Sequence, residues 1–163
     1  PTDGLRPASG GGQGAAIGCD PRRLQSLRRA AADAATLPLA ERVAVIDRLV
    51  NAVPYVDDKA NWESADYWAT LAEFAARGGD CEDYANAKYA LLRATGVPTS
   101  AMRVVVVQDR WTGGAHAVLV VDVDGVPMVL DNQAAAPVRA SDDARYRPIY
   151  AVSHAGWWVY LPY

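Results

Sequence analysis

One cysteine of the chain lies at a position that would make its thiol more reactive, within Gly78-Gly79-Asp80-Cys81-Glu82-Asp83. The double glycine ends one element, and the residues from Tyr84 to Leu92 are mostly good helix formers. Cys81 therefore falls in the first turn of a predicted helix, where unpaired N–H groups and the helix dipole favour a thiolate over a thiol. Since the thiolate is the nucleophilic form, Cys81 is a candidate catalytic nucleophile. The alternative is a buried structural cysteine.

Such a cysteine requires a base, and a predicted hairpin carries a candidate histidine together with an aspartate that could orient it. The dipeptide Asp124-Gly125 is a strong two-residue turn signal between two apolar runs. If these residues form the turn, Val118 faces Asp131, and His116 is a diagonal neighbour of Asp131 on the same face of the sheet. Diagonal positions lie about 7–8 Å apart, which the two side chains can bridge. The alternative is a core histidine that Asp131 satisfies without any part in chemistry.

A histidine oriented by a carboxylate is the base half of a Cys–His–Asp triad. In that arrangement His116 would hold Cys81 as a thiolate and then protonate the leaving amine, while Asp131 would fix the imidazole tautomer. The backbone N–H of Cys81 at the helix start is the natural donor to the oxyanion.

The carboxylates beside the cysteine act against its ionisation. Asp80, Glu82 and Asp83 would raise the pKa of the thiol, although acids in a first helical turn can also be simple caps. A bound cation would offset this repulsion, and carboxylate oxygens suit Ca²⁺. Further oxygens are available in the preceding loop, from Asp57, Asp58, Asn61 and Asp66.

The elements that must position these residues are predicted as helices in the first half of the chain. One helix begins at Asp20-Pro21, and a second runs from about Leu39 to Ala52. An irregular, aromatic-rich connection follows from Tyr55 to Tyr67. The capping box Thr70-x-x-Glu73 then opens a short helix before the double glycine. Two aromatic residues near this point are candidates for the walls of a substrate cleft, with packing in the core as the alternative: Trp62 and Trp68.

The second half of the chain predicts strands. Residues 102–107, 116–123 and 126–131 are rich in β-branched residues, and an aromatic tail that contains Tyr146 and Tyr150 adds strand or packing surface. The hairpin strands are apolar on both faces, so we expect them near the centre of a sheet covered by helices. Helices first and antiparallel strands afterwards indicate an α+β architecture.

Length and composition suit one domain. Of the 163 residues, 51% are hydrophobic and 21% charged, and the formal net charge of −3 leaves no basic stripe for a nucleic acid. No apolar run is long enough for membrane insertion. We expect a flexible N-terminal segment at residues 1–19 and a single domain at 20–163. The two cysteines, Cys19 and Cys81, do not make a disulfide framework, and Cys19 and His154 are expected to have no catalytic part.

The block from Gly78 to Asp83, continued by Ala87-Lys88-Tyr89, resembles the bacterial transglutaminase-like cysteine proteinases, which include LapG-type adhesin-cleaving proteases. The resemblance spans about residues 50–162. Its other motifs are Val53-Pro54-Tyr55-Val56, Asp66-Tyr67-Trp68-Ala69-Thr70, Ala115-His116 before Val118-Leu119, and Leu130-Asp131-Asn132. The chain departs from the family pattern at Leu71, where Pro is usual, and at Ala117, where Met is usual.

The resemblance implies a papain-like, transglutaminase-core fold in which Cys81 is the nucleophile, His116 the base and Asp131 the orienting acid. It also implies a calcium ion held by the acids that flank the cysteine, here Asp80 and Glu82. The expected substrate is a periplasmic or cell-surface protein such as a biofilm adhesin, and an inhibitory membrane signalling receptor is an expected partner. The chain would be periplasmic or secreted, with the export signal absent from this sequence.

Three other functions fit the same residues. A transglutaminase-like acyl transferase or a peptidoglycan amidase would use the same triad, and a non-catalytic periplasmic binding module would retain it unused.

Overall fold

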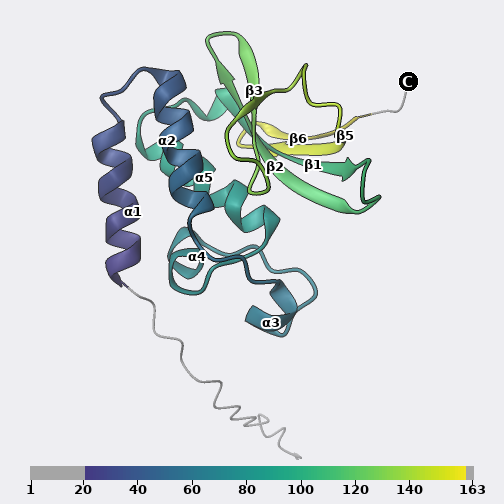
Figure 1. Ribbon diagram of the computed structural model, residues 1–163, viewed down its shortest axis with the longest axis horizontal. Helices are drawn as coiled ribbons and strands as arrows, with labels where there is room; N and C mark the ends of the chain where they lie inside the picture. The colour runs from purple at the N-terminus through teal and green to yellow at the C-terminus, as the bar shows by residue number, and fades with distance from the viewer. Residues whose placement is uncertain (1–20, 161–163) are drawn as a thin grey trace, which may run out of the picture.

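The computed structural model describes residues 21–160, in which the helices lie beside one antiparallel sheet (Figure 1). The helices are α1 (Pro21–Ala34), α2 (Leu39–Asn51), α3 (Asp58–Trp62), α4 (Leu71–Arg77) and α5 (Cys81–Ala94), with a 3₁₀ turn at Thr99–Ala101. The strands are β1 (Met102–Asp109), β2 (Ala115–Val123), β3 (Val126–Leu130), β4 (Val138–Arg139), β5 (Tyr146–Ser153) and β6 (Gly156–Val159). The predicted α+β order is therefore confirmed. The expected flexible segment and Cys19 lie outside the described residues.

The described sheet has six strands in the order β4-β3-β2-β1-β5-β6. The β2–β3 hairpin turns at Asp124 and Gly125, whose positive φ angles of 54° and 83° are those that a tight two-residue turn requires. Val123 pairs with Val126, and Leu119 pairs with Leu130, so the hairpin register is the predicted one. At the opposite edge β6 pairs with β5 alone among the described strands.

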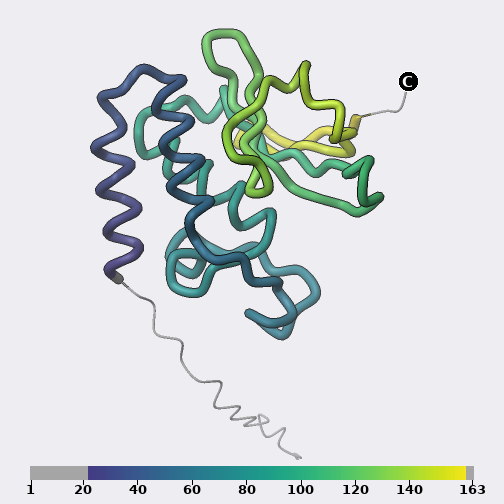
Figure 2. Tube along the Cα trace, in the orientation of Figure 1, coloured from purple at the N-terminus to yellow at the C-terminus, as the bar shows by residue number. Residues whose placement is uncertain are grey.

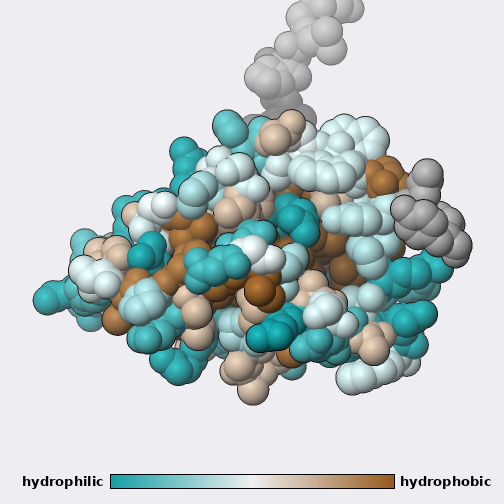
Figure 3. Space-filling view, turned by 90° about the horizontal axis from the view of Figure 1, so that it is seen from above, coloured by the Kyte–Doolittle hydropathy of each residue, from teal (hydrophilic) through white to brown (hydrophobic). Residues whose placement is uncertain are grey.

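The helices cover one face of the sheet. The trace in Figure 2 shows the chain passing from the purple and blue helices into the green and yellow strands, with α5 between α2 and the sheet. Buried side chains of this layer include Ile46, Phe74, Leu91 and Leu119. Seen from above, apolar surface gathers toward the middle of the molecule with polar residues around it (Figure 3).

The other face of the sheet carries a smaller apolar cluster. It consists of valines from β1, β2 and β3 with Ala151, and Tyr146 and Tyr160 pack against it. The prediction that the hairpin strands are apolar on both faces is right, but the expected covering by helices holds for one face only. Tyr146 of β5 and Tyr160, which follows β6, cover part of the second face in place of helices.

The connection from Tyr55 to Tyr67, expected to be irregular, contains the short helix α3. The Asp57 side chain caps this helix by accepting the N–H of Ala60 at 2.9 Å. The connection is held against the residues that precede α5, because the N–H of Val56 donates to the carbonyl of Gly79 at 3.0 Å. The loop is therefore fixed beside the start of the cysteine helix.

The double glycine is required by close packing. A Cβ atom at Gly78 would lie 2.3 Å from the carbonyl oxygen of Pro54, and the positive φ of 79° also favours glycine there. A Cβ atom at Gly79 would lie 2.2 Å from Oδ2 of Asp83. The predicted capping box of α4 is present, with Thr70 and Glu73 satisfying each other's backbone N–H groups.

Candidate active site

Cys81 is the first residue of α5 and lies half-buried in an open cleft. It is a free cysteine, and its Sγ donates to Oε2 of Glu82 at 3.2 Å. Because it opens the helix, its own backbone N–H has no acceptor within that helix. The cleft is lined by Ala65, Asp66, Trp68, Cys81, Glu82, Val106, Ala115, His116, Ala117 and Tyr150.

The structure brings His116 and Asp131 together. Nε2 of His116 lies 2.8 Å from Oδ1 of Asp131, and the two residues are only 6% and 3% exposed. Asp131 follows β3 directly, so the hairpin register places it beside the histidine strand as the sequence predicts. Since Nε2 is engaged by the carboxylate, Nδ1 is the ring nitrogen left to exchange a proton with a group in the cleft.

Two further groups hold the Asp131 carboxylate. The N–H of Gln133 donates to Oδ1 at 3.0 Å, and the hydroxyl of Tyr146 donates to Oδ2 at 2.7 Å. The Tyr146 ring also lies against the His116 ring, with centroids 5.4 Å apart. Burial acts to raise the pKa of Asp131, but hydrogen bonds from His116, Gln133 and Tyr146 hold it below its usual value. The sequence treats Tyr146 only as part of an aromatic tail, and no local signal marks it for this contact.

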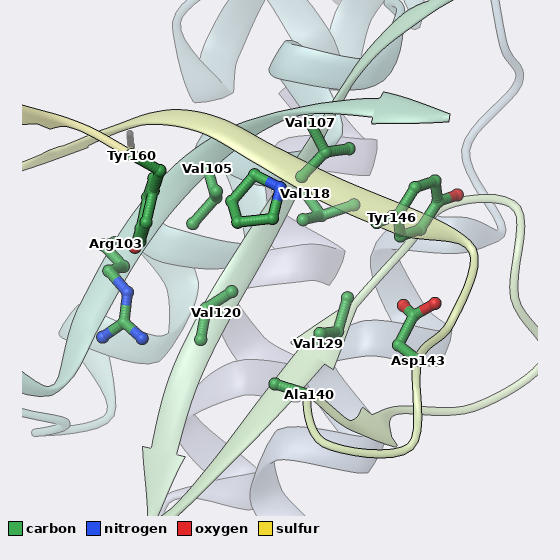
Figure 4. Close-up of a pocket in the computed structure, with 11 residues that line it drawn as sticks. Arg103, Val105, Val107, Val118, Val120, Val129, Ala140, Asp143, Tyr146 and Tyr160 are labelled. Carbon is green, nitrogen blue, oxygen red and sulfur yellow. The ribbon is translucent and has the colours of Figure 1, made fainter. Parts of the chain in front are cut away.

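Tyr146 also borders a pocket on the face of the sheet away from the helices. This pocket of about 210 Å³ is floored by valines of β1, β2 and β3. Figure 4 shows Tyr146 and Asp143 at one end of it and Arg103 and Tyr160 at the other. Tyr146 therefore packs against the second apolar face of the sheet and also donates its hydroxyl to the Asp131 carboxylate.

The electrostatics of the cleft disfavour a thiolate in the absence of a cation. Burial raises the pKa of the Cys81 thiol to about 12, and the hydrogen bond and charge of Glu82 and the charge of Asp80 act in the same direction. The backbone N–H of Ala117 opposes this rise. The sequence predicts that the neighbouring acids raise this pKa, and burial of the thiol adds to their effect.

Five carboxylates converge beside the cysteine. Oxygen atoms of Asp58, Asp80 and Asp83 lie within 4.8 Å of one another, and so do those of Asp58, Asp66 and Glu82. Oδ1 of Asp58, Oδ1 of Asp80 and Oδ2 of Asp83 are buried and have no hydrogen-bond partner in the described chain. Such orphaned oxygens are rare in protein interiors, and an ion is one explanation of them.

The acids repel one another. Burial, the hydrogen bond with Glu82 and the surrounding negative charges raise the pKa of Asp80 to about 8. Burial is also the largest cause that raises the pKa of Asp83 to about 6, although the N–H of Ala69 opposes it. The donor set consists of hard oxygens, which fits a Ca²⁺ ion.

Only some of the oxygen donors that the sequence suggests as cation ligands lie together in the structure. It brings Asp80, Glu82, Asp58 and Asp66 together and adds Asp83. Two candidates have other partners. Asp57 caps α3, and the amide of Asn61 donates to the carbonyl of Gly78 at 3.3 Å.

The two tryptophans suggested as cleft walls have different positions. Trp68 lines the cleft, and its indole N–H donates to Oδ1 of Asp66 at 3.1 Å. Trp62 instead packs on Tyr67, with ring centroids 4.4 Å apart, and under the Arg77 guanidinium. His154 is exposed.

Comparisons with known proteins relate the chain to one family of enzymes. A family model described as bacterial transglutaminase-like cysteine proteinase matches residues 17–162. The calcium-bound structure of Legionella pneumophila LapG is 27% identical with a TM-score of 0.77, and the match covers 87% of this chain and 80% of LapG. The EGTA-treated structure of the same protein is also 27% identical with a TM-score of 0.77, covering 86% and 77%. No curated protein sequence matches the chain.

Proposed function

Because the chain belongs to the bacterial transglutaminase-like cysteine proteinases, we propose that it is a calcium-dependent endopeptidase that acts through a thioester on Cys81. Membership confirms the resemblance read from the sequence and makes the chain a cysteine protease. The likeness to LapG confirms the α+β, transglutaminase-like fold. The observation that carries the proposed triad is the 2.8 Å contact of Asp131 with His116, which lines the same cleft as Cys81.

In the proposed reaction the Cys81 sulfur gives its proton to Nδ1 of His116 and attacks the carbonyl carbon of the scissile peptide bond. The oxyanion forms beside the start of α5, where the Cys81 N–H is free to donate. His116 then passes its proton to the leaving amine as the C–N bond breaks and the thioester remains. Water hydrolyses the thioester with His116 as base, which returns the thiol, and Asp131 holds the imidazole in one tautomer throughout.

Calcium fits this site because the chain supplies buried carboxylate oxygens that have no other partner. Asp58, Asp80, Glu82 and Asp83 would hold the ion, and its positive charge would offset the repulsion between them. Glu82 is the acid that accepts a hydrogen bond from the Cys81 thiol, so engagement of Glu82 elsewhere would release the sulfur for His116. LapG has been solved in a calcium-bound and in an EGTA-treated form, which supports calcium as the ion that this chain would bind.

We place the substrate among periplasmic or cell-surface proteins, with a biofilm adhesin as the specific candidate and an inhibitory membrane signalling receptor as the partner. The family resemblance suggests this class of substrate, and the cleft beside Cys81 is where the substrate would bind. No helix among residues 21–160 is long and apolar enough to cross a membrane. The cleft is open, has three alanines among its lining residues and is bordered by Trp68 and Tyr150, which suits an extended segment with small side chains at the scissile bond.

The reactivity of Cys81 tests the proposal. Iodoacetamide labelling would be followed against pH, with excess calcium or with a chelator, and read separately at Cys81 and Cys19 by peptide mass spectrometry. We expect Cys81 to label fast below about pH 7 with calcium, to slow with the chelator, and to lose its reactivity in His116→Ala. His154→Ala is the matched control, because that histidine is exposed and does not line the cleft, and it should leave the rate unchanged.

Equal labelling of Cys81 and Cys19 under every condition would overturn the proposed triad. If the triad stands, incubation of a candidate protein substrate with a lysine analogue separates peptide-bond hydrolysis from acyl transfer. Digestion of cell-wall fragments under the same conditions tests the amidase alternative.

A further inference from the structure

Lys88 is a buried charge that the proposed reaction does not use. Its Nζ lies 2.7 Å from Oδ1 of Asp47, and the two side chains are 0% and 1% exposed. Removing two charges from water carries a desolvation penalty that often cancels their mutual attraction, so stability alone is a weak reason for such a pair. The contacts around it indicate a different role.

Asn51 extends the pair toward the candidate active site. It lies one helical turn after Asp47 on α2, and its Nδ2 is 3.5 Å from Oδ2 of that residue. The same amide nitrogen donates to the backbone carbonyl of Asp131 at 2.9 Å and approaches that of Ala134 at 3.4 Å. The Asn51 amide therefore joins the buried ion pair to the segment that carries the orienting carboxylate.

That segment needs an anchor. The last pair of the β2–β3 ladder is Leu119 with Leu130, so the ladder ends immediately before Asp131. From that point the chain runs through turns to β4. The side chain of Asp131 is held by His116, Gln133 and Tyr146, whereas its backbone carbonyl is held by Asn51.

The Lys88–Asp47–Asn51 network is also connected to the proposed nucleophile through α5. Cys81 and Lys88 belong to the same helix, two turns apart, so both lie on the same side of α5. A continuous path runs from the cysteine along α5 to Lys88, across to Asp47 and Asn51 on α2, and then to the backbone carbonyl of Asp131, the residue whose side chain contacts His116. The relative positions of the three proposed catalytic residues are thus tied through two helices as well as through the sheet.

We propose that Asn51 is a positioning residue for the Asp131–His116 pair, held in place by the buried Lys88–Asp47 ion pair. The inference rests on the proposed function in taking Asp131 as the orienting acid. A displacement of about 1 Å at a reacting group can lower a rate by about 100-fold. The network acts by preventing such a displacement of the Asp131 segment.

The substitution Asn51→Ala tests this role with two independent readouts. The first is the rate of Cys81 alkylation with calcium, which we expect to fall by about tenfold or more. The second is the imidazole ¹⁵N spectrum at fixed pH, which reports the tautomer of each histidine. The chain has two histidines, so exposed His154 is an internal reference for His116. We expect the His116 resonances to move toward those of a freely exchanging ring while those of His154 stay unchanged.

Thr95→Ala is the matched control. It removes one buried side-chain hydrogen bond to backbone, from Thr95 Oγ1 to the carbonyl of Leu92 at 2.7 Å, at the far end of α5 from Cys81. It should lower the melting temperature without moving either readout. A second variant, Asp47→Leu with Lys88→Met, replaces the ion pair by apolar side chains and should move the His116 resonances in the same direction as Asn51→Ala.

An Asn51→Ala protein that is destabilised like Thr95→Ala but keeps wild-type His116 resonances would overturn the proposal and leave Asn51 a purely structural residue. Failure of the proposed function looks different. In that case wild-type Cys81 labels no faster than Cys19, while the imidazole spectrum still decides whether Asn51 positions the pair.

Discussion

At the scale of single residues, Asp131 is the most heavily bonded side chain of the candidate site. It accepts hydrogen bonds from His116, from the N–H of Gln133 and from the hydroxyl of Tyr146. Because these partners hold its pKa below the usual value in the folded state, the ionised form stabilises the fold. This contribution is fully present above the pKa of the unfolded chain and is lost as the pH falls through the lower, folded value.

We expect Tyr146→Phe to lower the free energy of unfolding by about 1–2 kcal/mol near neutral pH, because a hydrogen bond to a buried carboxylate is lost. The difference from wild type should shrink as the pH falls from neutral to below the usual aspartate pKa of about 4, because Asp131 then takes up a proton. Urea unfolding at the two pH values measures this. Tyr89→Phe, which removes a hydroxyl from a tyrosine packed against the helical core, is the control. A loss that is the same at both pH values would contradict the assigned partner.

At the scale of elements, the sequence predicts what local signals control. The hairpin register follows from Asp124 and Gly125, and the helix that starts at Cys81 follows from the double glycine and the helix formers after it. The hairpin register alone is enough to predict from the sequence that His116 and Asp131 lie close together.

Long-range contacts set the rest, and the sequence does not predict them. Tyr146 reaches Asp131 from β5, which pairs with β1 rather than with the hairpin. Asn51 ends a helix with no local pattern that points to a segment 80 residues further along the chain. These features arise from how the elements pack, so local periodicity carries no signal for them.

The start of α5 gives a prediction at this scale. Gly79→Ala would place a methyl group 2.2 Å from Oδ2 of Asp83, so the carboxylate and its 2.6 Å contact with the N–H of Ala69 must shift. We expect a loss of about 1–3 kcal/mol in stability and a weaker response to calcium. At Gly114 the nearest atom to an added methyl is Thr112 Oγ1 at 3.5 Å, so Gly114→Ala should change stability by less than about 0.5 kcal/mol.

Thermal unfolding with calcium and with a chelator measures both variants. A Gly79→Ala protein that is as stable and as responsive to calcium as Gly114→Ala would show that the acid cluster tolerates the displacement.

At the scale of the whole molecule, the acid cluster couples stability to pH and to cations. The folded pKa values of Asp80 and Asp83, about 8 and about 6, lie above the usual value for an aspartate, mainly because of burial. Folding therefore favours the protonated acids, and stability without a cation is lost as the pH rises from about 4 toward 8. A bound cation would reverse this dependence by favouring the ionised acids.

With chelator present, we expect the melting temperature to fall between about pH 5 and pH 8, and saturating calcium to raise it most at the higher pH. Calcium at about 100 times its dissociation constant would add about 2.7 kcal/mol. Asp80→Asn should be more stable than wild type in chelator near pH 8, because it removes one of the repelling charges, and should gain less from calcium. Asp142→Asn removes an exposed acid outside the cluster and is the control. A calcium response that persists unchanged in Asp80→Asn would argue against this site.

The edge strand β6 bears on how the purified protein behaves at high concentration. Its backbone pairs with β5 on one side only among the described residues, and Trp157 and Val159 are 71% and 54% exposed. An exposed apolar strand edge is a template to which another strand can add. Self-association should therefore begin at this edge and increase with protein concentration.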